Sequence, residues 1–331
     1  MKLFSETIRF VLVHGMACKP PENIWLDLWR NCLLENLRIQ DPALGRRLLD
    51  DPDLLVSAYW ADAVPDHLAE LPARIKGLQQ SVAALLELRR QHKAGLHVPA
   101  GGLTADQYRH FAPHIIEALH AALVFGPSIR SEHGWELDRY HRDSRVADQI
   151  RRPLEQRLRE CWDQGQRVVI LSHSLGGAVA YDVLWRFAHR PEAEFRNYRT
   201  RKIDLLITMG APLAEPHVQE IMLSGRALAK RTAALVGERR QAWLGNVRRW
   251  HNYAALGDIV CQDLDMEAHF FAGMRRDLRQ YGKDDLRDYR LLFNAYREPE
   301  GGPNPHKAFG YLVQPKLAQN LSRLLRETDP G

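Results

Sequence analysis

The chain has 331 residues, of which 45% are hydrophobic and 26% charged, a composition typical of a globular protein with a large buried core. The formal net charge is +5, and the basic residues are spread along the sequence, which favours solvated helix faces over a nucleic-acid-binding surface. The 4 cysteines lack metal-type spacing and are too sparse for a disulfide framework, so they indicate a reducing, cytoplasmic compartment.

Short β-rich runs alternate with longer stretches of helical periodicity, which predicts a parallel sheet with helices on both faces. The run from Val168 is apolar at every position, as expected of a central strand buried on both sides. The predicted strands are Ile8–Val13, Leu54–Trp60, Val168–Leu171, Ile203–Met209, His251–Ala255 and Tyr289–Tyr296. We therefore expect a single domain over residues 1–331, with a three-layer α/β architecture and a mostly parallel sheet of about six strands.

Helices are predicted between these strands from the spacing of apolar residues. They cover Ile24–Arg38, Ala147–Trp162, the stretch from Gly177 to His189, and a last helix that carries Leu317, Leu321 and Leu324. Gly165 follows the second of these helices and is a plausible stop before the strand at Val168. Each helix thus connects two strands or closes the chain.

Two segments are longer than connections between strands require. Residues 66–130 carry apolar residues at helical spacing, and Thr104 with Gln107 forms a capping-box pattern ahead of a second helix. Residues 215–247 form a basic helical stretch. Insertions of this size serve either as a cap or lid over a site or as helices packed on the sheet edge, and the sequence leaves both open.

A serine lies at the turn between a predicted strand and a predicted helix. Ser172-His173-Ser174-Leu175-Gly176 follows the apolar run that ends at Leu171 and precedes the helix from Gly177. A small-x-Ser-x-Gly pattern in this context is typical of a strained turn that presents its central serine at the end of a sheet. The alternative is an ordinary serine at a helix N-terminus. Ser174 is the candidate nucleophile.

Five short stretches resemble the α/β-hydrolase superfamily, and in particular its serine lipases and esterases. They are residues 12–16 (Leu-Val-His-Gly-Met), 172–177 (Ser-His-Ser-Leu-Gly-Gly), 208–212 (Thr-Met-Gly-Ala-Pro), 256–260 (Leu-Gly-Asp-Ile-Val) and 304–306 (Asn-Pro-His). The resemblance covers almost the whole chain and implies an α/β-hydrolase-type fold. Ser172 stands where the family usually has glycine, the family's two N-terminal strands are missing, and His173 matches a structural residue of the family.

The family's chain order of nucleophile, acid and histidine implies the remaining catalytic residues. Ser174 is the nucleophile, Asp258 the acid and His306 the base. Asp263 lies close enough to compete with Asp258 as the acid. Downstream of the acid only His269 and His306 remain, and His306 lies in a loop before the last helix, where the family has its base.

The resemblance also implies an oxyanion site. His14 and Gly15 match the family's oxyanion loop, so the backbone N–H groups of Met16 and Leu175 are expected to hold the oxyanion. His14, Gly15 and Gly176 would support that loop, with His14 orienting it rather than acting as a base. The alternative for Gly15 is a plain turn after a strand.

The predicted function is cleavage of carboxylic esters through an acyl-enzyme, with a small-molecule or lipid-like acyl ester as substrate. An acyltransferase or thioesterase would use the same residues, and a non-catalytic binding protein of the same fold is the third reading. No phosphate-binding glycine loop, His-Glu-x-x-His or paired-cysteine motif occurs, so we expect neither cofactor nor metal and no nucleic acid. Residues 226–249 could contact anionic lipid at a membrane surface, although no apolar run approaches the length of a span. The oligomeric state is left open.

Overall fold

Six parallel strands form the centre of the molecule, in a computed structural model that describes residues 7–16, 19–51, 53–63, 71–93, 140, 143–214, 218, 243–261 and 265–328. The strands lie in the order β2-β1-β3-β4-β5-β6, and every neighbouring pair is parallel. Their bounds are Ile8–Val13 (β1), Leu55–Ser57 (β2), Arg167–His173 (β3), Leu205–Met209 (β4), Trp250–Ala255 (β5) and Leu286–Leu292 (β6). The prediction of a three-layer α/β fold with a parallel sheet is confirmed.

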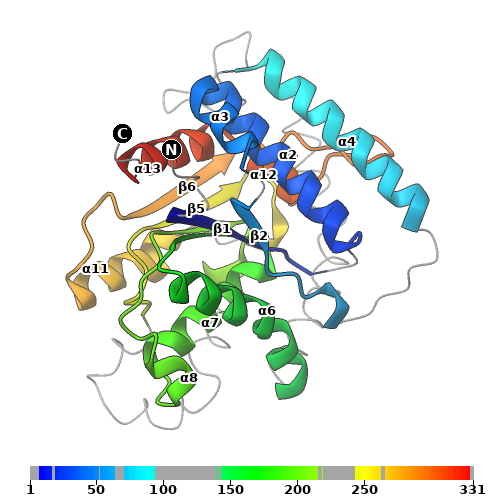
Figure 1. Cartoon of the computed structure of the whole chain (residues 1–331). Helices are drawn as coiled ribbons and strands as arrows, with labels where there is room; N and C mark the ends of the chain where they lie inside the picture. The colour runs from blue at the N-terminus through cyan, green and yellow to red at the C-terminus, as the bar shows by residue number, and fades with distance from the viewer. Residues whose placement is uncertain are drawn as a thin grey trace.

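Helices cover both faces of this sheet, as Figure 1 shows. Their bounds are Glu22–Gln40 (α2), Pro42–Leu49 (α3), Leu71–Gln91 (α4), Ser144–Asp163 (α6), Leu175–His189 (α7), Ala193–Arg196 (α8), Ala272–Leu278 (α11), Ala308–Leu312 (α12) and Pro315–Thr328 (α13). The helices α2, α3, α4, α12 and α13 pack on one face, and α6, α7, α8 and α11 pack on the other.

The alternation of side chains along the strands divides the core into two layers. On β1, Phe10 and Leu12 join the cluster under α2 and α13, while Val11 and Val13 join the cluster under α6 and α7. The central strand β3 is almost wholly buried, which explains its apolar run from Val168 to Leu171. This burial fixes the ends of the parallel strands, and therefore the loops that follow them.

Strands β2 and β6 differ most from their predicted bounds, whereas the ends of the other strands lie within two residues of the prediction. Strand β2 ends at Ser57 rather than Trp60, because the backbone N–H of Trp60 donates to the ring of His14 instead of to a neighbouring strand. Strand β6 begins at Leu286 and ends at Leu292, where the predicted strand ran on to Tyr296. The side chain of Asn294 accepts a hydrogen bond from the Tyr296 N–H, and this local turn replaces further pairing.

Of the two long insertions, only part falls within the described residues. Helix α4 belongs to the first, residues 66–130, and packs on α2 with Val82, Leu85 and Leu86 in the core. The predicted capping box at Thr104 and the helix after it lie outside the described residues, as does most of residues 215–247. No helix in the described ranges is both long and apolar enough to cross a bilayer.

Candidate active site

Ser174 occupies a strained turn between β3 and α7. Its φ of 56° and ψ of −132° make it one of three non-glycine residues in the described part of the chain with positive φ. Its backbone N–H donates to the carbonyl of Met209 at 2.9 Å, which fixes the turn against β4. Among the described residues, its hydroxyl caps no amide of α7. The serine therefore does not serve as an ordinary helix cap, and strain of this kind is found at functional sites.

Small residues around Ser174 let the helix approach the sheet. A Cβ on Gly176 would lie 2.5 Å from the carbonyl oxygen of His14, and one on Gly177 would lie 2.6 Å from the Cβ of Ala211. Ser172 stands where the resemblance calls for glycine, and its hydroxyl donates to the carbonyl of Ile207 at 2.9 Å. Serine is accommodated at position 172 because its hydroxyl forms this hydrogen bond with β4.

The structure brings Ser174, His306 and Asp258 together in one hydrogen-bonded line, the serine line. Nε2 of His306 lies 3.0 Å from Oγ of Ser174, and its Nδ1 lies 3.0 Å from each carboxylate oxygen of Asp258. The three residues follow β3, β5 and β6, whose carboxyl ends meet at one edge of the sheet. Because the carboxylate only accepts, Nδ1 carries the proton and Nε2 accepts from the serine hydroxyl.

Asp263 and His269 are the alternatives for the acid and the base. Asp263 lies outside the described residues. His269 lies in the short π-helix Glu267–Phe271, and its backbone N–H donates to the carbonyl of Asp265. It is His306 that lies between Ser174 and an aspartate.

The backbone of the histidine loop is held by His173, which the resemblance implies to be structural, and by Asn294, which the sequence pattern does not single out. Nε2 of His173 lies 2.6 Å from the carbonyl oxygen of His306, so it is protonated and donates. Burial keeps the pKa of His173 well below its usual value, so the ring is neutral. Asn294 donates to the carbonyls of Pro305 and Lys307, at 2.7 and 2.9 Å. These bonds grip the loop on both sides of the base.

His14 locks the loop that follows β1. Its ring is fully buried, lies 4.4 Å from the Trp60 ring in a stacked arrangement and accepts from the Trp60 backbone N–H at 3.0 Å. The other ring nitrogen therefore carries the proton and donates to the carbonyl of Gly15 at 2.7 Å. Burial, assisted by the nearby charge of Lys19, lowers the pKa of His14 to about 3. His14 is thus neutral, and its ring connects the backbone of Trp60 to the carbonyl of Gly15.

Gly15 and its neighbours bring this loop against the serine. A Cβ on Gly15 would lie 2.5 Å from the Cβ of Ser174, so only glycine allows the contact. Leu175 is the first residue of α7, and its N–H has no acceptor within the helix. Met16 is buried beside Gly15, and its carbonyl accepts from the ammonium of Lys19. The use of the Met16 and Leu175 N–H groups as oxyanion donors stays a prediction.

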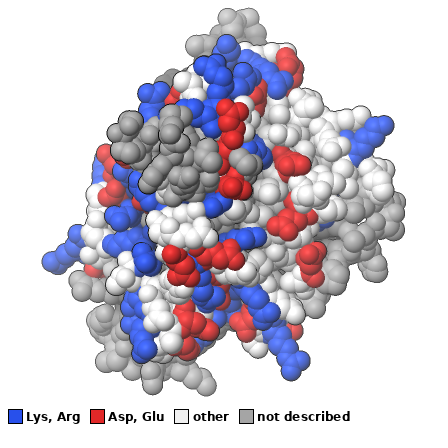
Figure 2. All heavy atoms as spheres, viewed as in Figure 1, with Lys and Arg blue, Asp and Glu red and all other residues white. Residues whose placement is uncertain are grey.

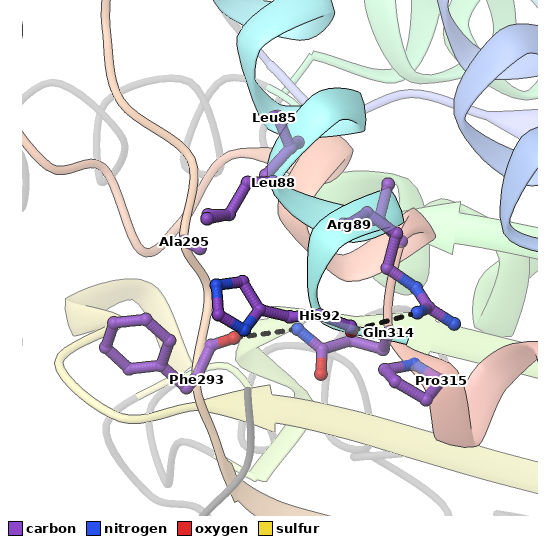
Figure 3. A pocket seen from close by; sticks show the side chains of 9 residues that line it. Leu85, Leu88, Arg89, His92, Phe293, Ala295, Gln314 and Pro315 are labelled. Carbon is purple, nitrogen blue, oxygen red and sulfur yellow. Dashed lines mark hydrogen bonds between the residues drawn. The ribbon is translucent and has the colours of Figure 1, made fainter. Parts of the chain in front are cut away.

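A separate hollow lies between α4, the segment after β6 and the turn between α12 and α13 (Figure 3). Its described lining includes none of the three residues of the serine line. The side chain of Gln314 lines this hollow and donates to the carbonyl of Phe293 at 2.9 Å. The lining residues are Leu85, Leu88, Arg89, His92, Phe293, Ala295, Val313, Gln314 and Pro315.

Comparison of the chain with protein-family models, with curated proteins and with solved structures returned no match. We therefore infer the function from the geometry of the site and from the sequence pattern.

Proposed function

We propose that the protein is a serine hydrolase that cleaves carboxylic esters through an acyl-enzyme. The observation that carries this proposal is the unbroken line from Asp258 through His306 to Ser174, with Ser174 in a strained turn. A structural serine needs neither the strain nor a histidine oriented by a buried carboxylate. An activated nucleophile needs both.

In the first half of the reaction, Oγ of Ser174 attacks the ester carbonyl while Nε2 of His306 takes the hydroxyl proton. Asp258 stabilises the resulting imidazolium, and the N–H groups of Met16 and Leu175 hold the oxyanion. The C–O bond then breaks, His306 returns the proton to the leaving alkoxide, and an alcohol departs. In the second half a water attacks the acyl-enzyme by the same steps, which releases a carboxylic acid and restores Ser174.

We propose a small-molecule or lipid-like acyl ester as the substrate, because the insertions at residues 66–130 and 215–247 are rich in apolar residues at helical spacing. No cofactor or metal enters this mechanism. The triad that supports ester cleavage would also serve an acyltransferase or a thioesterase. Product analysis with an alcohol or thiol acceptor present distinguishes these activities from hydrolysis.

The charge distribution supports a small-molecule substrate rather than nucleic acid. Figure 2 shows basic and acidic side chains interleaved on the face viewed there, and many of the arginines form ion pairs, such as Arg167 with Asp204 at 2.7 Å. The described cysteines Cys32, Cys161 and Cys261 are buried free thiols. We accordingly propose a reducing compartment, the cytoplasm, as the site of action.

The test is turnover of p-nitrophenyl esters of increasing acyl-chain length. We expect hydrolysis by the native protein and a loss of about 10⁴-fold or more in kcat for Ser174→Ala. Ser172→Ala is the matched control, because it also removes a buried serine hydroxyl beside the turn. That hydroxyl donates to a strand carbonyl and not to His306. Short-chain preference would indicate an esterase and long-chain preference a lipase. Folded native protein that turns over no ester would contradict the proposal.

A further inference from the structure

Asp258 is surrounded by donors. Its side chain is fully buried, and each oxygen has a partner besides His306. The backbone N–H of Val260 donates to Oδ1 at 3.0 Å, and the hydroxyl of Tyr311 donates to Oδ2 at 2.6 Å. The bond from Tyr311 is the shorter of the two and is in the range of charge-assisted O–H···O⁻ bonds.

The fold places the Tyr311 hydroxyl with little freedom. Tyr311 is fully buried on α12, a helix that begins two residues after His306, so one short segment carries both the base and the tyrosine. The backbone N–H of Ala255, at the end of β5, donates to the Tyr311 oxygen at 2.9 Å. With that oxygen accepting from Ala255, its own proton is directed to Asp258.

Gly210 completes this packing. Its φ is 56°, and a Cβ there would lie 2.6 Å from Oδ2 of Asp258 and 3.2 Å from Cε2 of Tyr311. The carboxylate oxygen that Tyr311 holds is therefore enclosed by the backbone of β4's end as well. Without the tyrosine hydroxyl, this oxygen would be buried with only His306 as a hydrogen-bond partner among the described residues.

We propose that Tyr311 is a positioning residue that holds the carboxylate of Asp258 toward Nδ1 of His306 and moderates how strongly that carboxylate attracts the imidazolium. The use of this arrangement in ester cleavage rests on the proposed function, whereas the effect on His306 does not. Burial and the neighbouring carboxylate raise the pKa of Tyr311 well above its usual value, so the phenol stays a donor.

The hydrogen bond from Tyr311 to Asp258 determines the direction of the effect on His306. A donor that withdraws charge from the carboxylate weakens its attraction for protonated His306. Removing the hydroxyl should therefore let the imidazolium persist to higher pH, and should also loosen the orientation of Asp258. The persistence of the imidazolium moves the acid limb of the pH–rate profile to higher pH. The looser orientation of Asp258 lowers the plateau of the profile. A merely structural tyrosine would change stability without moving the limb.

The test compares Tyr311→Phe with Tyr253→Phe. Tyr253 is an equally buried tyrosine, and its hydroxyl accepts from Asn320 at 2.8 Å, away from the serine line. For Tyr311→Phe we expect kcat/KM toward a p-nitrophenyl ester to fall about tenfold, chiefly through kcat. The acid limb should move up by roughly half a pH unit or more. Tyr253→Phe should leave both unchanged.

A second measurement separates this proposal from the proposed function. The protonation midpoint of the His306 ring, followed by nitrogen-15 NMR, should rise in Tyr311→Phe and fall when a ring-fluorinated tyrosine, a stronger donor, replaces Tyr311. These shifts are expected whether or not the protein cleaves esters. A midpoint equal to that of the native protein in both variants would overturn the positioning role. Absence of ester turnover by the native protein would overturn only the proposed function.

Discussion

Gly210 is a single backbone position on which the acid and base both depend. It follows β4 with positive φ, and a Cβ there would lie 2.6 Å from Oδ2 of Asp258 and 3.2 Å from Nδ1 of His306. Gly165 also has positive φ, of 70°, but has open space around its Cβ position. The two glycines share the backbone cost of an alanine substitution and differ only in what the added methyl group meets.

We expect Gly210→Ala and Gly165→Ala each to lose about 1 kcal/mol of unfolding free energy from the left-handed backbone alone. Only Gly210→Ala should also lose activity, by about 100-fold, because the methyl group displaces Asp258 from His306. Urea unfolding and kcat/KM of both variants provide the check. Equal activity in the two would show that the contact between Gly210 and the acid does not matter.

The residues of the serine line could be predicted, and those that hold it could not. Ser174 is signalled by its neighbours in sequence, and Asp258 and His306 by chain order. Tyr311 and Asn294 carry no comparable signal, because each acts through a contact that only the folded chain creates. A tyrosine in an apolar helix is ordinarily a core residue, and its sequence gives no indication that its hydroxyl reaches a buried carboxylate.

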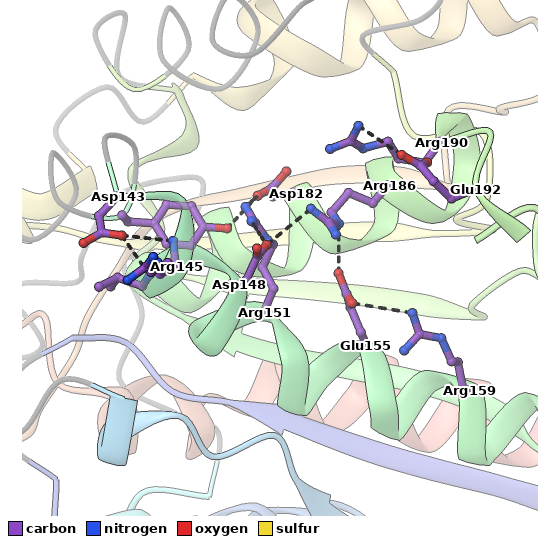
Figure 4. Close-up of polar contacts among 12 residues, drawn as sticks. Asp143, Arg145, Asp148, Arg151, Glu155, Arg159, Asp182, Arg186, Arg190 and Glu192 are labelled. Atoms are coloured by element: carbon purple, nitrogen blue, oxygen red, sulfur yellow. Dashed lines mark hydrogen bonds and ion pairs between the residues drawn. The ribbon is translucent and has the colours of Figure 1, made fainter. Parts of the chain in front are cut away.

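At the level of elements, α6 and α7 are joined by a network of buried and half-buried charges (Figure 4). Arg151 is only 3% exposed and pairs with Asp182 at 2.7 Å. The hydroxyl of Tyr140 donates to the same carboxylate at 2.6 Å. Nearby, Arg186 on α7 pairs with Glu155 on α6 at 2.9 Å. This network fixes the helix that begins directly after Ser174.

Asp182→Asn should destabilise the protein by about 2 kcal/mol, because the buried Arg151 keeps its ion pair with the more exposed Asp148 but loses the carboxylate of Asp182. The exposed pair of Arg190 and Glu192 offers the control, and Glu192→Ala should change stability by no more than about 0.5 kcal/mol. Thermal unfolding measures both. Ester turnover at a temperature where each variant is folded should match the native protein, and equal thermal stability of the two variants would refute the role assigned to Arg151.

Most elements could be predicted from the spacing of apolar residues, since the strands and long helices bury one or both faces in the core. The ends of β2 and β6 could not. At both places a side chain, His14 or Asn294, takes the hydrogen bond that would have extended the strand. Such competition depends on residues distant in sequence or on a local turn, and neither alters the hydrophobic pattern.

At the level of the whole molecule, buried histidines make stability depend on pH. Burial lowers the pKa of His14 and of His251 to about 3, from a usual value of 6.5. The unfolded chain therefore binds more protons than the folded one between these values, and stability falls as the pH drops below about 6.5. Asp288 acts in the opposite direction, since burial raises its pKa to about 6. His173, whose pKa burial also keeps well below its usual value, adds to the effect of His14 and His251, and these histidines outweigh one carboxyl group.

We expect the free energy of unfolding to fall between pH 7 and pH 5, by about 2 kcal/mol for each of His14 and His251, with a further fall from His173 and less the opposing effect of Asp288. Urea unfolding at several pH values measures this fall. The His251→Leu variant removes one of these histidines and should show a shallower decline. A decline of the same slope in the variant would mean that His251 is not the source.

If Ser174 is the activated nucleophile that we propose, a fluorophosphonate probe should label it in the folded protein. The probe forms a covalent bond to an activated serine oxygen, so the intact mass of the folded protein should increase by one adduct, located by peptide mapping on Ser174. Ser172→Ala should be labelled like the native protein, and Ser174→Ala should not be labelled. Folded native protein that resists the probe, or an adduct that persists in Ser174→Ala, would show that Ser174 is not an activated nucleophile.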